Sequence, residues 1–269
     1  MQQIIMLDFD GVVVNESYQT TKDIRPAIIS LLSSGAMIVP NSDTPVARMR
    51  DFCRATLGIE TSVVIAERGA VVALGQRMLI TTDIKGVQEC REQVVAALRS
   101  NGYLVFVGDS TVWVRERKLF APNRRIVLVD TQREQTLGCF FLRTDFQGLP
   151  RVDMQWASEA LELVTKVDLP VGISPWDYNP AYGIAIANAT EVSKTDGFRA
   201  LCQEYPGATF YMIGDSDSDI IADERVIHCS VGNGAANLKV RADFVAPGLY
   251  TQGLEQCIGW ISRRAQGER

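Results

Sequence analysis

Two short acidic segments contain the residues of this chain that are best suited to chemistry. Residues 8–11 read Asp-Phe-Asp-Gly, directly after the apolar run Ile4–Leu7. Side chains alternate along an extended chain, so Asp8 and Asp10 point to the same side, where two like charges are costly unless a cation binds between them. A hard cation such as Mg²⁺ takes oxygen ligands and keeps waters for a phosphate-bearing substrate. The segment therefore indicates a magnesium site, with Gly11 allowing a tight turn beside it.

The second acidic segment, residues 214–219, reads Gly-Asp-Ser-Asp-Ser-Asp and follows the apolar run Thr209–Ile213. A calcium loop of the EF-hand type is excluded, because Ile220 and Val226 stand where that loop needs Gly and Glu. A second acidic strand end facing the first would complete an oxygen-rich magnesium site. One carboxylate near the strand end is the expected direct ligand, and the others are expected to hold waters or to cap the next helix.

Two further segments could bind phosphate. Residues 40–45 read Pro-Asn-Ser-Asp-Thr-Pro between a predicted strand and a predicted helix, so the Ser42 hydroxyl and nearby backbone N–H groups could hold an anion. Ser42 and Thr44 are also typical of plain helix caps. Lys194 follows the predicted N-cap Ser193, with Asp196 as the third residue of a capping box. A cation in the first turn of a helix opposes the helix dipole and costs stability. The position of Lys194 is explained if its charge faces a phosphate or the aspartates. The alternative is a solvated surface lysine.

The elements that must position these residues follow an alternating order. Short apolar runs alternate with segments of helical spacing, which predicts a parallel sheet covered by helices on both faces. In such a sheet, ligands bind outside the carboxyl ends of the strands, where both acidic segments lie. The predicted strands are Ile4–Leu7, Ala36–Pro40, Ser62–Ile65, Thr209–Ile213, Val226–Val231 and Asp243–Val245.

The middle of the chain has a different pattern. A predicted helix, Val87–Leu98, is followed by three strand-like stretches and by a helix near Met154–Lys166; the stretches are Tyr103–Val107, Thr111–Arg115 and Arg125–Val129. We predict an α/β fold in which a Rossmann-like, doubly wound parallel sheet forms the core (residues 1–81 and 180–269). An α+β cap domain (residues 82–179) is inserted into it.

Composition and charge exclude several classes of protein. The chain has 269 residues, 46% of them hydrophobic, and a net charge of −5 without a long basic run, which argues against general nucleic-acid binding. The chain has six cysteines, none of them in a CxxC pair, and one histidine. This pattern argues against a zinc site and against a disulfide scaffold. We expect the cysteines to be buried free thiols of a cytoplasmic enzyme. The N-terminal sequence resembles no export signal, and no apolar run is long enough to span a membrane, so no membrane partner is expected.

In chain order, these motifs resemble the haloacid dehalogenase superfamily of phosphohydrolases. They are DxDG after the first strand, a Ser/Thr after the second, a helix-initial Lys and a late GDxxxD. The insertion after the second motif is similar to the Cof-type branch, which includes sucrose-phosphate phosphatases. The segments Ala-Glu-Arg-Gly-Ala at 66–70 and Gly-Asn-Gly-Ala at 232–235 are also similar to that branch.

The resemblance implies a role for each matching residue. Asp8 would be the nucleophile, Asp10 the general acid and base, and Lys194 a catalytic cation. Magnesium would be held by Asp8, the backbone carbonyl of Asp10 and Asp215, with Asp219 supporting them. The expected residues at the transferring phosphoryl group are Ser42, Asp43 and Lys194.

Three positions depart from the branch. Its second motif often reads Thr-Gly-Arg, whereas this chain has Ser42-Asp43-Thr44, so the substrate-contacting arginine is either missing or supplied by Arg48. Ser218 and Arg68 stand where the branch usually has Asn. These changes bear on substrate recognition and leave the chemical step intact.

The resemblance implies a Mg²⁺-dependent phosphatase that hydrolyses a small phosphorylated metabolite, with a sugar phosphate preferred, through an aspartyl phosphate. Solvated charges and core tryptophans are the more ordinary explanation of the basic and aromatic residues of the cap, so the preference for a sugar phosphate rests mainly on the resemblance. These residues would also suit an anionic sugar; they are Arg115, Arg117, Lys118, Arg124, Arg125, Trp113, Trp156, Trp176 and Tyr178. A phosphotransferase or phosphomutase using the same intermediate, or a catalytically silent binding protein with this fold, are the alternatives.

Overall fold

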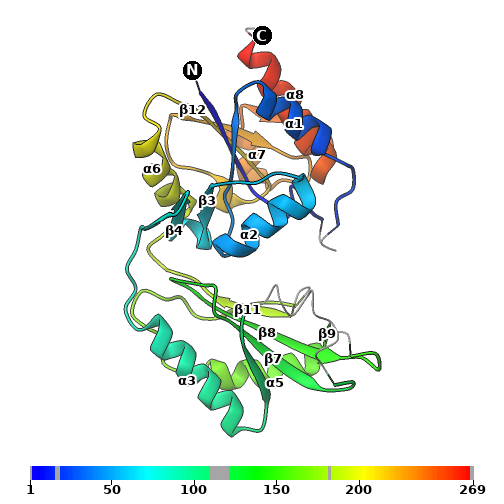
Figure 1. The fold of residues 1–269 in the computed structure, drawn as a ribbon, viewed down its shortest axis with the longest axis vertical. Coiled ribbons are helices and arrows are strands. Elements are labelled where there is room, and N and C mark those ends of the chain that lie inside the picture. Colours follow the sequence, from blue (N-terminus) through cyan, green and yellow to red (C-terminus); the bar gives the residue numbers. More distant parts are fainter. Residues whose placement is uncertain (1, 16–18, 110–120, 149, 181–182, 267–269) are drawn as a thin grey trace. The chain divides into compact units, whose positions relative to one another are not determined.

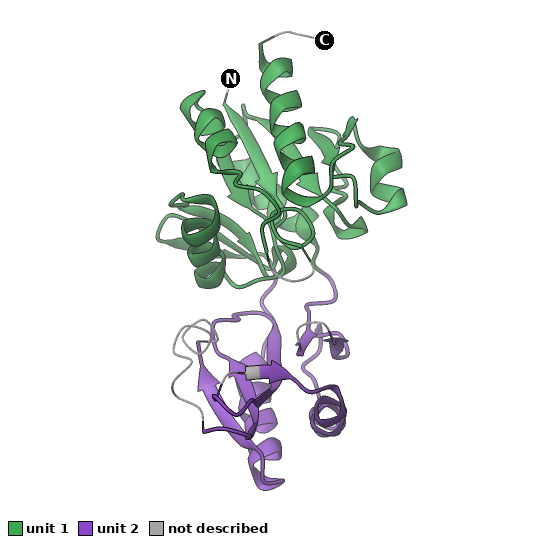
Figure 2. Cartoon of the chain, turned by 90° about the vertical axis from the view of Figure 1, so that its right-hand side faces the viewer, with its two compact units in different colours: residues 1–81, 192–269 green, residues 82–191 purple. Residues whose placement is uncertain are grey.

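The chain divides into two compact units. The computed structural model describes residues 2–15, 19–109, 121–148, 150–180 and 183–266, so the predicted strand Thr111–Arg115 lies outside the described residues, as do four of the cap residues named above. One unit comprises Met1–Thr81 and Val192–Arg269, and the other comprises Thr82–Glu191 (Figure 2). Each is described by itself below.

A sheet forms the centre of the first unit (Figure 1). Its strands are parallel and follow the order β14-β13-β12-β1-β2. The predicted α/β fold class with its Rossmann-like sheet is therefore confirmed. Leu7 of β1 lies between Pro40 of β2 and Ile213 of β12, so these strands end at the same edge. The strands are β1 (Gln3–Leu7), β2 (Met37–Pro40), β12 (Thr209–Gly214), β13 (Val226–Ser230) and β14 (Phe244–Val245).

Helices pack against this sheet through alternate residues of its strands. Met6 and Met212 form a buried cluster with Phe198 and Leu201 of α6 (Lys194–Glu204). Helix α8 (Tyr250–Ala265) packs against β13, β14 and α1 (Arg25–Ser33). Burial of strand side chains on both sides explains why these strands read as continuous apolar runs. Among the described residues, this unit also contains α2 (Val46–Phe52), with a π-helical extension Cys53–Leu57, and α7 (Ala236–Arg241).

The predicted strand at Ser62–Ile65 lies in a second sheet instead of the parallel one. It forms β3 (Val63–Ala66), which pairs antiparallel with β4 (Val71–Leu74), and β4 pairs with β5 (Arg77–Ile80). A single parallel bridge between Asn41 and Ile65 joins β3 to the end of β2. An apolar run of four residues shows that a strand is buried, and its partner strands decide to which sheet it belongs.

In the part of the chain that the structure describes, the second unit consists of a mixed sheet and two helices. Its sheet has the order β10-β11-β8-β7-β6, with β9 paired to β8. Trp156, fully buried against Phe141, lies in the core between the sheet and the helices. The strands are β6 (Leu104–Gly108), β7 (Arg125–Asp130), β8 (Leu137–Thr144), β9 (Pro150–Val152), β10 (Asp177–Asn179) and β11 (Ile184–Ala187), and the helices are α3 (Val87–Ser100) and α5 (Met154–Val164).

The boundary placed at residue 180 from the sequence falls inside the second unit. Strand β11 follows this position and pairs with β8, so the unit continues to Glu191. All six cysteines are free and buried. Within the described residues, no helix has the length and apolar content needed to cross a membrane.

Candidate active site

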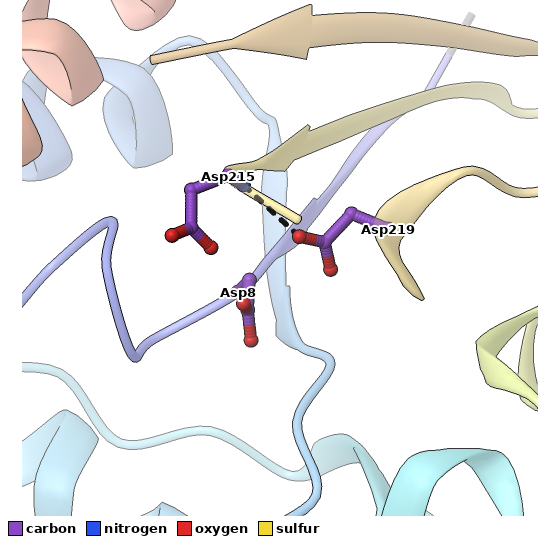
Figure 3. Close-up of side chains that lie close together, drawn as sticks. All are labelled: Asp8, Asp215 and Asp219. Carbon is purple, nitrogen blue, oxygen red and sulfur yellow. Dashed lines mark hydrogen bonds between the residues drawn. The ribbon is translucent and has the colours of Figure 1, made fainter. Parts of the chain in front are cut away.

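Three carboxylates converge at the edge where β1 and β12 end. Asp8 directly follows β1, and its backbone N–H donates to the carbonyl of Ile213 in β12 at 3.0 Å. Asp215 directly follows β12, and Asp219 ends the short 3₁₀ turn Asp217–Asp219. One oxygen of each of these carboxylates lies within 4.8 Å of the others (Figure 3). Two strand ends that are far apart in the sequence thus meet because their strands are neighbours in the sheet.

The carboxylate of Asp219 is fully buried, and each of its oxygens has partners. Its Oδ2 accepts hydrogen bonds from the backbone N–H groups of Asp215 (3.0 Å) and Ser216 (2.9 Å), and from the Ser216 hydroxyl (3.0 Å). Its Oδ1 accepts a 2.6 Å bond from Lys194. A carboxylate with so many protein donors is better suited to fixing its neighbours than to binding a cation directly.

Lys194 connects the two acidic segments. Its Nζ lies 2.9 Å from Oδ1 of Asp8 and 2.6 Å from Oδ1 of Asp219, and its side chain is almost completely buried. It is the first residue of α6, and the predicted capping box is present, with Asp196 Oδ2 accepting from the Ser193 backbone N–H at 2.9 Å. Burial alone would lower the pKa of Lys194, but the charges of Asp219 and Asp8 raise it above its ordinary value. The side chain is therefore protonated at neutral pH.

The electrostatics of Asp8 and Asp215 fit a cation site. Burial, followed by the charge of Asp219, raises the pKa of Asp8 well above its ordinary value, although Lys194 opposes this effect. The same two causes raise the pKa of Asp215 to about 6. The negative charge at this edge exceeds what one lysine compensates. A divalent cation between Asp8 and Asp215 would relieve the excess, so the residues present fit Mg²⁺.

Gly11 allows the first acidic segment to pass close to Asp215. Its φ of 78° lies in the left-handed region that favours glycine, and a Cβ at this position would overlap the carboxylate of Asp215. Asp10 is half-buried beside it. Burial raises the pKa of Asp10, while the charge of Lys194 acts in the opposite direction, which places Asp10 within electrostatic range of the lysine.

The loop after β2 borders the same site. Ser42 is buried, and its Oγ accepts a 3.2 Å hydrogen bond from the backbone N–H of Thr44. Neither residue caps α2, whose N-cap is Pro45 without a side-chain bond. The charge of Asp43 contributes to the raised pKa values of both Asp10 and Lys194, so Asp43 lies near both.

A strained turn joins this loop to the start of α6. Glu67, Arg68 and Gly69 all have positive φ, at 48°, 60° and 99°. The Arg68 N–H donates to the Ser42 carbonyl at 3.2 Å, and a Cβ on Gly69 would overlap the carbonyl of Ser193. Left-handed backbone at non-glycine residues costs free energy and persists where surrounding structure enforces it. The turn therefore fixes Ser42 relative to Lys194.

Two residues of the site have no chemical motif of their own in the sequence. Arg48, in the first turn of α2, is buried, and its charge, like that of Lys194, opposes the rise in the pKa of Asp10 that burial causes. Asn233, after β13, donates from Nδ2 to the carbonyl of Gly11 at 2.8 Å. From the sequence, Arg48 is expected only as a possible replacement for the arginine that the second motif lacks. Asn233 lies in a Gly-Asn-Gly segment, which by itself indicates only a turn.

Comparisons with known proteins give no match to a family model or to a curated protein. Solved structures of similar fold do match over nearly the full chain. A haloacid dehalogenase-like hydrolase from Bacteroides thetaiotaomicron is 16% identical, with 97% of this chain and 100% of that chain covered and a TM-score of 0.62. The phosphatase BT1666 from the same organism is 18% identical, with 97% and 96% coverage and a TM-score of 0.56.

A third solved structure is that of BT4131, described as a sugar phosphatase of subclass IIB in the haloacid dehalogenase superfamily. It is 14% identical to this chain, with 97% of this chain and 99% of that chain covered and a TM-score of 0.55. The matched structures thus include haloacid dehalogenase superfamily proteins and the subclass that the sequence motifs resemble. At these identities the likeness shows a shared fold.

Proposed function

We propose that this chain, which has the fold of the haloacid dehalogenase superfamily, is a Mg²⁺-dependent phosphatase. Its substrate would be a small phosphorylated metabolite, with a sugar phosphate preferred, and the reaction would pass through a phosphorylated Asp8. The observation that carries the proposal is the placement of Asp8. Its carboxylate lies at a strand end, 2.9 Å from Nζ of the buried Lys194 and within 4.8 Å of carboxylate oxygens of Asp215 and Asp219.

The residues that would hold magnesium are the carboxylates of Asp8 and Asp215 and the backbone carbonyl of Asp10. Asp219 would support them through its bonds to Lys194 and to the Asp215 N–H. When bound, the cation would neutralise negative charge on Asp8 and on the phosphoryl oxygens. This compensation matters because an ionised nucleophile must approach an anionic phosphate ester.

The first chemical step would transfer the phosphoryl group to Asp8. A carboxylate oxygen of Asp8 would form a bond to phosphorus while the bond from phosphorus to the leaving oxygen breaks. Lys194 and Ser42 would bind the phosphoryl oxygens, and Lys194 would already be charged and in place, since it is fixed by Asp8 and Asp219. Asp10 would protonate the leaving alkoxide, so that a neutral alcohol departs.

The second step would regenerate Asp8. Asp10, now ionised, would take a proton from water as the water oxygen attacks phosphorus, and the bond between phosphorus and Asp8 would break to release phosphate. The raised pKa of Asp10 suits this double role, because it keeps more of the carboxyl group protonated near neutral pH, with a proton to give to the leaving oxygen, and makes the ionised carboxylate a stronger base. The enzyme would act in the cytoplasm.

Replacement of Asp8 by Asn tests the proposal. The variant keeps the size of the side chain and removes the nucleophile, so we expect hydrolysis of para-nitrophenyl phosphate with Mg²⁺ to fall by about 10³-fold or more. Asp217→Asn is the matched control, because Asp217 lies in the second acidic segment but is exposed, and its carboxylate accepts a hydrogen bond from the exposed Asn237. Its activity should stay close to that of the wild type.

Two further measurements identify the intermediate and the acceptor. Acid quenching during turnover, followed by peptide mass analysis, should find one phosphoryl group on the peptide that contains Asp8. Product analysis with added acceptor sugars separates hydrolysis from transfer, because a transferase would phosphorylate the sugar. Wild-type activity in the Asp8→Asn variant, or turnover that persists in excess chelator, would overturn the proposal.

A further inference from the structure

The loop Val231–Ala235, which follows β13, contacts both acidic segments of the site. The backbone N–H of Val231 donates to the carbonyl of Gly214 at 3.2 Å, and that of Ala235 donates to the carbonyl of Asp215 at 2.7 Å. Between them, Nδ2 of Asn233 donates to the carbonyl of Gly11 at 2.8 Å. The loop thus bonds to the backbone after β12 on one side and to the backbone after β1 on the other.

Asn233 is held in this orientation by its second hydrogen bond. Its Oδ1 accepts from the backbone N–H of Tyr250, the first residue of α8, at 2.9 Å. Because one partner is an acceptor and the other a donor, the amide has a single orientation that satisfies both. A Gln side chain would be longer, and an Asp side chain would place an oxygen against the carbonyl of Gly11.

The rest of the loop is also anchored. The N–H of Gly232 donates to the carbonyl of Gly248 at 2.7 Å, and Nζ of Lys239 donates to the carbonyl of Gly232 at 2.7 Å. Tyr250 itself has a φ of 49°, a left-handed value that surrounding structure must enforce. Asn233 therefore presents its amide from a loop that is fixed at several points.

The bond to Gly11 matters because Gly11 lies directly against the carboxylate of Asp215, with no room for a Cβ. A shift of the Gly11 peptide would change the distance between the first acidic segment and Asp215. We propose that Asn233 is a positioning residue for the cation site: by holding Gly11 while its own loop holds Asp215, it sets the spacing between the two acidic strand ends. This inference rests on the proposed function and adds a residue to it.

Magnesium binding, measured by calorimetry without substrate, tests the inference. Asn233→Ala removes both bonds, and Asn233→Leu removes them while keeping the volume of the side chain. We expect the dissociation constant for Mg²⁺ to rise about 10-fold or more in both, as for other groups that orient metal ligands. With a phosphate ester as substrate, the concentration of Mg²⁺ for half-maximal activity should rise in parallel, with most of kcat recovered at saturating Mg²⁺.

Asn237→Ala is the matched control, because it removes an exposed amide bond to Asp217 at 2.9 Å from the adjacent helix. Its dissociation constant should equal that of the wild type. Binding is compared at a temperature where the circular dichroism of every variant matches the wild type. If the Asn233 variants do not fold, Lys239→Met loosens the same loop by removing only the bond to Gly232, and it should weaken Mg²⁺ binding as well.

The outcomes separate the inference from the proposed function. Wild-type Mg²⁺ affinity in a folded Asn233 variant, or in Lys239→Met where only that variant folds, would overturn the positioning role and leave the proposed function standing. A wild-type protein that binds no Mg²⁺ would overturn both. A loss of thermal stability in the Asn233 variants without any change in Mg²⁺ affinity would reduce Asn233 to a structural residue and overturn the inference.

Discussion

The ammonium of Lys194 donates a 2.6 Å hydrogen bond to Oδ1 of Asp219, and both side chains are buried. On its other side, Oδ2 of Asp219 accepts from the backbone N–H groups of Asp215 and Ser216. One carboxylate therefore fixes both the cation of the site and the backbone of the second acidic segment. This pair links the stability of the fold to the geometry of the proposed chemistry.

Loss of this carboxylate should destabilise the protein strongly. We expect Asp219→Ala to lower the free energy of unfolding by about 3 kcal/mol or more, because buried donors lose their acceptor and Lys194 loses a partner. Urea unfolding measures the change. Asp217→Ala, an exposed neighbour in the same turn, should stay within about 0.5 kcal/mol of the wild type. A loss below about 1 kcal/mol in Asp219→Ala would contradict the role assigned to the pair.

The Gly11→Ala variant should distinguish the cost of backbone strain from the effect of the close approach to Asp215 on cation binding. Alanine at a positive φ costs about 1–2 kcal/mol, and the new Cβ would in addition displace the carboxylate of Asp215. Gly75→Ala is a matched control, since Gly75 has a φ of 64° but open space around the added Cβ. Urea unfolding should show a loss of stability in both variants, at least as large in Gly11→Ala, and Mg²⁺ titration should show weaker binding only in Gly11→Ala. Equal Mg²⁺ affinities would show that the close approach to Asp215 has no role.

Asp215→Asn should stabilise the metal-free protein at neutral pH. The pKa of Asp215 is raised to about 6, mainly by burial and then by Asp219, so the folded state binds its proton more readily than the unfolded chain does. Stability therefore falls as pH rises from about 4 through 6, and the full cost is present above that range. We expect the variant to gain about 1 kcal/mol or more near pH 7.5, or roughly 2–4 °C in Tm.

Thermal scans in the presence of chelator measure this gain, which should vanish near pH 4 because Asp215 is then protonated in both states. Added Mg²⁺ should raise the Tm of the wild type and leave that of Asp215→Asn nearly unchanged. A variant that is less stable than the wild type at neutral pH without metal would contradict the electrostatic origin of the shift.

His228 should give the protein a separate acid sensitivity. Its Nε2 accepts a 3.1 Å hydrogen bond from the backbone N–H of Ile221, and burial lowers its pKa despite the charge of Asp243. Below about pH 6.5 the unfolded chain takes up the proton first, so stability should fall as pH falls through that value. His228→Gln keeps an acceptor that does not titrate, and the difference in unfolding free energy between the two proteins should shrink or reverse toward acid pH.

Because the chain has one histidine, the imidazole resonance in an NMR titration belongs to His228 alone. Its midpoint should lie below 6.5 in the folded protein. A midpoint at or above that of an unstructured peptide would show that the bond to Ile221 does not hold the ring neutral. A midpoint below 6.5 would support a structural role for His228, in which the neutral ring accepts the bond from Ile221.

Much of the fold follows from local patterns in the sequence. The apolar runs at Ile4–Leu7 and Thr209–Ile213 became neighbouring parallel strands, and the capping box of Ser193 and Asp196 starts α6 as predicted. Such features depend on residues close in sequence, which is why they are readable there. The run at Ser62–Ile65 was assigned to the wrong sheet, because four apolar residues carry no information on which strand pairs with them.

By itself, the sequence determined which residues have the chemistry: the aspartates after two strands, a serine after a third and a lysine at a helix start. Only the tertiary structure decided which carboxylate oxygens are left to bind a cation, because that depends on hydrogen-bond partners, such as Lys194, that lie far away along the chain. Asp219 uses both of its oxygens within the protein, whereas Asp8 shares one of its oxygens with Lys194. The hydrogen bond from Asn233 to Gly11 joins residues that are 222 positions apart in the sequence. It too depends on the tertiary structure, because only the fold brings these two atoms together.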